Sequence, residues 1–66
     1  MDLLIDLKTE YENGLITRGG YVLRGCEILQ VENPLKIDRR WLSDQLGMTY
    51  AATTQQLHTL KSKGLI

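Results

Sequence analysis

Residues 37–66, IDRRWLSDQLGMTYAATTQQLHTLKSKGLI, constrain the fold more than any other part of the chain. Their apolar positions recur at intervals of four and three on both sides of one glycine. That spacing places the apolar residues on one face of each of two helices. The pattern predicts a short helix at about 39–46, a turn at Gly47 and a longer helix at 49–63. The residues expected to face the core are Leu42, Leu46, Thr53, Leu57 and Leu60.

The residue types around this turn support the prediction. Asp38 and Thr49 each precede a predicted helix, where their side-chain oxygens can accept hydrogen bonds from the free amides of the first turn. Ser43 is small enough to let the second helix pass closely, and Gly47 supplies the backbone freedom that a sharp turn needs. Met48 is expected to fill the corner between the two helices.

An N-terminal helix is predicted at about 2–13. Asp2 and Asp6 lie near its positive end, where carboxylates are favoured. Gly14 can adopt the left-handed conformation after the helix, and Leu15 is expected to fold back onto its last turn. Because such a short helix is marginal alone, it must pack on the rest of the domain or on its copy in a second chain. Its apolar stripe consists of Leu3, Leu4, Leu7 and Tyr11.

The middle of the chain predicts one more helix, at about 21–31, after a loop at 17–20 that contains paired glycines. Gly25 inside this helix costs roughly 1 kcal/mol relative to alanine. A close helix crossing and simple tolerance both explain a glycine there. The residue before Pro34 avoids the helical region, so the helix must end before it. Residues 35–37 are either one short strand or merely extended.

The length of 66 residues indicates a single small domain, residues 1–66. A chain of this size buries only about 60% of its unfolded surface on folding. No apolar run approaches the ~20 residues that cross a bilayer. The first residues carry acid where a secretory signal carries base. We therefore expect a cytoplasmic protein with no membrane partner.

Cys26 is the only cysteine and His58 the only histidine, so the chain can form neither an intrachain disulfide nor a protein metal site. We expect Cys26 to be a buried, inert thiol rather than a reactive one. The chain also lacks a phosphate-binding loop and paired groups for acid–base catalysis. The chain is therefore predicted not to be an enzyme and not to need a cofactor. Trp41 either completes the core or lies partly exposed beside a partner.

The formal net charge is zero, but the charges are unevenly distributed. Residues 1–33 carry six acids and three bases, whereas residues 34–66 carry two acids and five bases. The two halves are therefore −3 and +3, and no acid follows Asp44. Such a distribution lets one face approach phosphates while the other avoids them.

Residues 35–66 resemble the core of a winged helix-turn-helix DNA-binding domain, as in MarR-like and LexA-like transcription regulators. The apolar, small and glycine positions around the turn carry the resemblance. The closing Leu60-x-x-x-Gly64-Leu65-Ile66 is similar to the passage from a recognition helix into the first wing strand. The resemblance implies a mostly α fold: a trihelical core at about 21–66, an added N-terminal helix and at most a minimal β element. Because the sequence stops where the wing should begin, the wing either follows it or is lacking.

In this family the second helix of the unit enters the major groove with its N-terminal residues at base edges. Carried onto helix 49–63, Gln55 can pair with adenine and Ala51 can touch a thymine methyl group. Hydroxyl groups at the helix start can reach phosphate, and flanking basic residues can position the helix on the backbone. A merely solvated polar surface is the alternative for this face. The candidate DNA-binding residues are Arg39, Arg40, Thr49, Tyr50, Ala51, Thr54, Gln55, His58, Lys61 and Lys63.

The sequence therefore predicts a DNA-binding protein, a bacterial or phage transcription regulator whose partner is double-stranded DNA. A homodimer is expected, since one small module offers few base contacts and two-fold symmetry doubles them. The alternative is a winged-helix-like module that binds protein, through the N-terminal helix, and not DNA. Zero net charge, the missing wing and the apolar N-terminal helix support that alternative.

Overall fold

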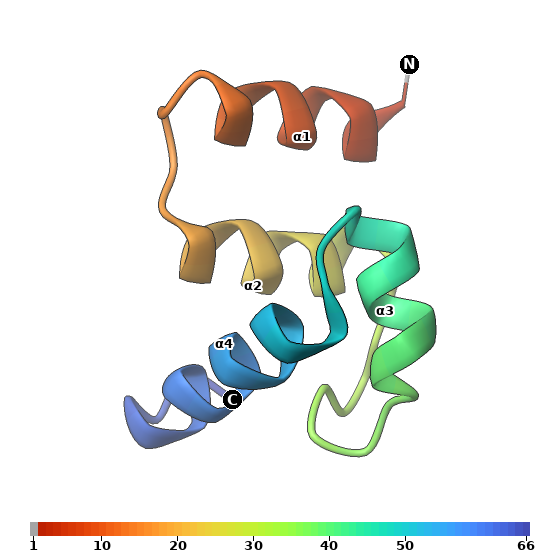
Figure 1. Ribbon diagram of the computed structural model, residues 1–66, viewed down its shortest axis with the longest axis vertical. Coiled ribbons are helices and arrows are strands. Elements are labelled where there is room, and N and C mark those ends of the chain that lie inside the picture. Colours follow the sequence, from red (N-terminus) through yellow and green to blue (C-terminus); the bar gives the residue numbers. More distant parts are fainter. Residues whose placement is uncertain (1) are drawn as a thin grey trace.

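Four helices make up the regular structure of the protein (Figure 1). They are α1 (Leu3–Glu12), α2 (Arg18–Ile28), α3 (Arg39–Leu46) and α4 (Tyr50–Ser62). The computed structural model describes residues 2–66, and within that range no β-strand is found. The prediction of a mostly helical fold is thus confirmed, and residues 35–37 form part of a turn rather than a strand.

A hydroxyl or carboxylate side chain caps the N-terminus of every one of these helices. Asp38 accepts hydrogen bonds from the amides of Arg40 and Trp41, at 3.0 and 3.4 Å. Thr49 accepts from the amide of Ala52 at 3.1 Å. These bonds satisfy amides that have no partner inside the helix. Both predicted caps are confirmed; Asp2 and Thr17 cap the other two helices.

The four helices also end alike, with one residue in the left-handed region followed by an amide that bonds back to the last turn. These amide bonds measure 2.9–3.0 Å. Three of the left-handed residues are glycines, which adopt this conformation without steric cost. Gln30, with φ of 59°, is the one non-glycine residue with positive φ among residues 2–66. The four amide-to-carbonyl pairs are Leu15 to Glu10, Val31 to Cys26, Met48 to Ser43, and Leu65 to Leu60.

The predicted limits of α2 were wrong at both ends. Residues 17–20 are not a loop, because Thr17 accepts a hydrogen bond from the Gly20 amide at 3.1 Å and starts the helix. This cap offsets the cost of the paired glycines, which occupy the first turn. At the other end the helix stops at Ile28 rather than near residue 31, since Gln30 turns the chain although no glycine marks the position.

The side chains of Leu15 and Trp41 lie at the surface rather than in the core. Leu15 does not fold back onto α1: it is 73% exposed, although its amide completes the helix end. The backbone bond fixes only the main chain, and no neighbouring element covers the side chain there. Trp41 is 41% exposed, so of the two predicted positions it takes the partly exposed one.

The second helix lies at the centre of the molecule. It packs against α1 on one side and α4 on the other, and α3 packs against α4. In Figure 1, α1 lies above α2 and runs in the opposite direction, and α4 passes below α2. The radius of gyration, 10.9 Å, matches the roughly 11 Å expected for a compact chain of this length. The buried apolar core consists of Leu7, Tyr21, Val22, Cys26, Leu42, Leu46, Leu57 and Leu60.

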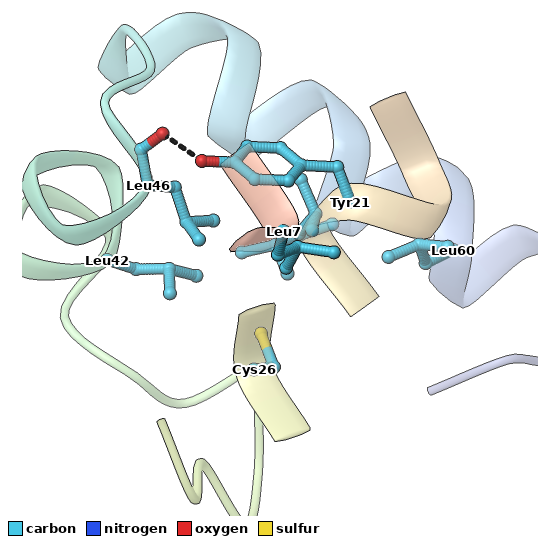
Figure 2. Close-up of a cluster of buried hydrophobic side chains, with 8 residues drawn as sticks. Leu7, Tyr21, Cys26, Leu42, Leu46 and Leu60 are labelled. Carbon is cyan, nitrogen blue, oxygen red and sulfur yellow. Dashed lines mark hydrogen bonds between the residues drawn. The ribbon is translucent and has the colours of Figure 1, made fainter. Parts of the chain in front are cut away.

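Tyr21 joins the two sides of this core. Its hydroxyl donates a hydrogen bond to the carbonyl oxygen of Leu46, at the end of α3 (Figure 2). Its ring stacks on that of Tyr11, with centroids 4.6 Å apart and planes 6° from parallel. Burial, together with the nearby Tyr11 and Glu12, raises the pKa of the Tyr21 hydroxyl, which therefore stays protonated and able to donate.

The two buried polar residues of the core, Ser43 and Thr53, are satisfied locally. Ser43 donates to the carbonyl of Arg40 at 2.9 Å. Thr53 donates to the carbonyl of Thr49, also at 2.9 Å. This bond explains how a threonine occupies a fully buried position between α4 and the core. Cys26 is buried as predicted, and burial and the neighbouring Glu27 raise the pKa of its thiol.

Within residues 2–66, none of the helices combines the length and the apolar character needed to cross a membrane.

Candidate nucleic-acid interface

Most of the predicted site residues belong to α4. Three residues of α4, Thr53, Leu57 and Leu60, are buried against the rest of the protein. The helical repeat of about 3.6 residues then turns Ala51, Gln55 and His58 outward. All three are exposed, so the sequence placed them correctly on the free face of this helix.

A depression of about 530 Å³ runs along one side of this face, between the start of α3 and the middle of α4. Basic and polar side chains line it together with the apolar Leu35 and Leu57. Arg39 lines it from the start of α3, and Leu35 lines it from the turn before α3. The other lining residues come from successive turns of α4. The structure thus brings five predicted site residues together around one hollow. Its lining residues are Leu35, Arg39, Thr54, Gln55, Leu57, His58 and Lys61.

A second depression, of about 280 Å³, adjoins the first and shares Leu35 and Arg39 with it. Arg40 and Tyr50 also line this hollow, and the Arg40 guanidinium lies 5.8 Å from the centre of the Tyr50 ring. At that distance the cation is attracted by the face of the ring. The contact fixes a positive charge beside the first residue of α4.

The positive charges around these hollows are free of internal ion pairs. Among residues 2–66 one salt bridge is found, between Arg24 and Glu27 at 3.2 Å, on the surface of α2. Arg39, Arg40 and Lys61 therefore form no ion pair within residues 2–66, although the Asp38 carboxylate lines the smaller hollow together with the two arginines. In addition, the buried Nε of Arg39 and the buried hydroxyl of Thr54 have no hydrogen-bond partner among the described residues.

Three predicted residues line neither of these two hollows. Thr49 is engaged in capping α4 and lines a different depression, on the other side of the helix. Lys63 is the C-cap residue of α4, more than three helical turns from the predicted base-reading end. Ala51 lines none of the hollows described above, but it is exposed in the same row as Gln55.

Arg18 is a basic residue beside α4 that the sequence pattern did not single out. It begins α2, yet with Thr49 and Ala52 it lines a depression of about 390 Å³ at the start of α4. Its Nε donates a hydrogen bond to the Tyr11 hydroxyl at 2.9 Å. In the sequence it belongs to the acidic half of the chain. Because Arg18 precedes α4 by more than thirty residues, no local sequence pattern indicates that the two lie side by side.

The described residues, 2–66, contain no cluster of histidine, cysteine or acidic side chains that could hold a metal ion. The surface along α4 presents hydrogen-bonding side chains, cations and a small apolar contact at Ala51. Comparisons with protein-family models, with curated proteins and with solved structures found no match to this chain.

Proposed function

We propose that the protein binds double-stranded DNA, with α3 and α4 acting as a helix-turn-helix and α4 entering the major groove. The observation that carries this proposal is the exposed polar face of α4 with unpaired basic side chains along its edge. Arg39 and Arg40 enter this edge from α3, and Lys61 from α4 itself. Phosphate groups are the natural partners of such a row of cations.

The dimensions of the helix suit that role. With 13 residues, α4 is roughly 20 Å long, and the major groove of B-form DNA, about 12 Å wide, admits one helix. Gln55 is exposed in the middle of the free face, where its amide can pair with an adenine edge. Ala51 lies one turn earlier and offers a methyl contact to thymine. Arg39 and Arg40 would then hold the backbone phosphates on one side.

The biological setting that fits this chemistry is a transcription regulator acting as a homodimer. A single module of this size reads few base pairs, and a two-fold pair of modules would double the contacts. The core of α2, α3 and α4 with α1 added outside is compatible with the resemblance to winged helix-turn-helix regulators. After α4 the chain turns at Gly64, and no wing strand is formed within residues 2–66.

The decisive experiment measures binding to a fluorescently labelled random-sequence duplex by anisotropy as salt is varied. In the double variant Arg39→Ala/Arg40→Ala we expect affinity to fall about 60-fold at 0.1 M salt, because each lost phosphate contact contributes a factor of about eight there. The slope of log affinity against log salt should decrease in magnitude by about 1.8.

The matched control is Lys8→Ala/Arg24→Ala, which removes the same charge from α1 and α2, outside the residues that line the α4 hollows. This control should keep both the affinity and the slope. Thermal unfolding of each variant would show whether the half-buried Arg39 also supports the fold. Unchanged binding by the Arg39/Arg40 variant would contradict the proposed interface. In a binding-site selection, Gln55→Ala should relax the preference at one base position.

A second candidate function is a protein-binding module, favoured by the apolar residues on the opposite side of the molecule. Leu3 and Ile5 of α1 are each 59% exposed, and Leu15 is exposed in the following turn. These side chains offer apolar contacts to a protein partner, and Leu3 and Ile5, two residues apart, do so on different sides of α1. Absence of any DNA complex at low salt, together with a stable complex at α1, would favour this function over the first.

A further inference from the structure

Arg18 lies beside the start of α4, and a hydrogen bond to Tyr11 orients its guanidinium. Its Nε donates to the Tyr11 hydroxyl, and Tyr11 stacks on Tyr21. Tyr21 in turn bonds to the carbonyl of Leu46, the last residue of α3. The guanidinium is thus connected through two aromatic rings to the turn that sets the position of α4.

This arrangement leaves the charge of Arg18 available to a ligand. Tyr11 is a neutral acceptor, so the hydrogen bond orients the guanidinium without compensating its charge. No carboxylate of residues 2–66 forms an ion pair with it, and the residue is exposed. Arginine carries five N–H donors, of which the bond to Tyr11 uses one. The others can form a bidentate pair with a phosphate group, for which the planar guanidinium is well suited.

Arg18 and Arg39 stand on opposite sides of the outward face of α4. Arg18 shares its depression with Ala52, whereas Arg39 shares its depression with Thr54. Because successive helical residues are about 100° apart, Ala52 and Thr54 project on either side of the row that contains Gln55. A helix lying in the major groove has a phosphate backbone on each side, so it needs a cation on each side to be centred.

We infer that Arg18 binds a DNA backbone phosphate on the side of α4 opposite to Arg39 and Arg40. This inference rests on the proposed DNA binding and adds to it a second point of attachment. The two contacts together would fix the rotation of α4 about its own axis, and thus which side chains meet the base edges. Arg18 is a positioning residue in this scheme, since phosphate contacts carry no sequence information directly.

The test compares Arg18→Ala with Arg24→Ala, using the same labelled random-sequence duplex. Both arginines are exposed on α2 and each substitution removes one positive charge, but Arg24 is paired with Glu27 and does not line the α4 depressions. Arg18→Ala should weaken binding about eightfold at 0.1 M salt and reduce the salt slope by about 0.9. Arg24→Ala should leave both quantities unchanged.

Two further variants separate phosphate binding from support of the fold. Arg18→Lys keeps the charge and should retain the salt slope, although it loses the bidentate geometry. Tyr11→Phe keeps Arg18 but removes its anchor. It should therefore weaken DNA binding less than Arg18→Ala and leave the salt slope intact. A purely structural role for Arg18 would lower the midpoint of thermal unfolding and leave the salt slope of the remaining folded protein unaltered.

The outcomes can be told apart. If the unaltered protein binds DNA and Arg18→Ala behaves like Arg24→Ala, the inference is wrong while the proposed function stands. If the unaltered protein shows no DNA binding at low salt, both fail.

Discussion

The two sides of α2 differ in how completely the neighbouring helices cover them. On the side of α3 and α4, the contact is made by fully buried residues such as Leu42 and Leu57, and the helices approach closely at Gly25. On the side of α1, one residue of that helix, Leu7, is buried, and the Tyr11 ring supplements it. Figure 2 shows Leu42 and Leu46 on one side of Tyr21 and Leu60 on the other.

This difference separates an inner unit from an outer layer. The unit of α2, α3 and α4 holds the turn and the outward face of α4 in place, which the proposed docking of α4 into a groove would require. The first helix forms an outer layer, and it leaves apolar side chains exposed. The comparison predicts that damage to the inner unit costs more stability than equivalent damage at α1.

The largest expected effect comes from Leu57→Ala, set against Leu7→Ala. Both leucines are buried, but Leu57 lies in the inner unit, where the surroundings can collapse least. We expect Leu57→Ala to lower the free energy of unfolding by about 3–4 kcal/mol and Leu7→Ala by about 2 kcal/mol. Urea unfolding followed by circular dichroism would measure both. Equal losses would show that α1 is as integral to the fold as α4.

An intermediate effect is expected from Tyr21→Phe, because this residue links the two sides of α2. Removing the hydroxyl leaves the Leu46 carbonyl buried without its partner, which should cost about 1–3 kcal/mol. Tyr11→Phe retains the stacked ring and loses only a surface hydrogen bond to Arg18, so its cost should be below about 1 kcal/mol. Thermal unfolding of the two variants tests this order; the reverse order would place the critical contact on the α1 side.

The smallest effects are expected from a pair of glycine substitutions in α2. A Cβ at position 25 would clash with the Leu46 side chain, so Gly25→Ala should destabilise by about 1 kcal/mol net of its better helix propensity. A Cβ at position 19 would meet Gln56 Oε1 and Leu60 Cδ2 at 3.6 and 3.7 Å, which are ordinary contacts. Gly19→Ala should therefore stabilise by about 0.5 kcal/mol. If the denaturant midpoint shifts in the same direction in both variants, relative to the unaltered protein, the close approach at Gly25 is contradicted.

The short-range features of the fold were predictable from the sequence. Asp38, Gly47 and Thr49 located the ends of α3 and the start of α4, since a cap or a left-handed turn depends on hydrogen bonds within about five residues. The periodicity likewise identified the buried face of α4, including Thr53. Prediction was poorer at Gln30 and at the glycine pair of α2, where the residue type is atypical for its conformation.

Part of the candidate site was also predictable. Helical spacing alone placed Ala51, Gln55 and His58 on one exposed face of α4, because that depends only on which residues of the same helix are buried. The hollows beside this face could not be predicted in this way. Each requires α4 to lie at a particular distance and angle from another segment of the chain.

The sequence by itself thus determined where α3 begins and ends, where α4 begins, and which faces of α3 and α4 are apolar. Only the tertiary structure decided that Arg39 stands between two hollows, that Gly25 meets Leu46, and that Arg18 lies beside the start of α4. The physical reason is the range of the interactions. Capping and periodicity act within one or two turns of the chain, whereas these neighbours depend on how separate helices pack against one another.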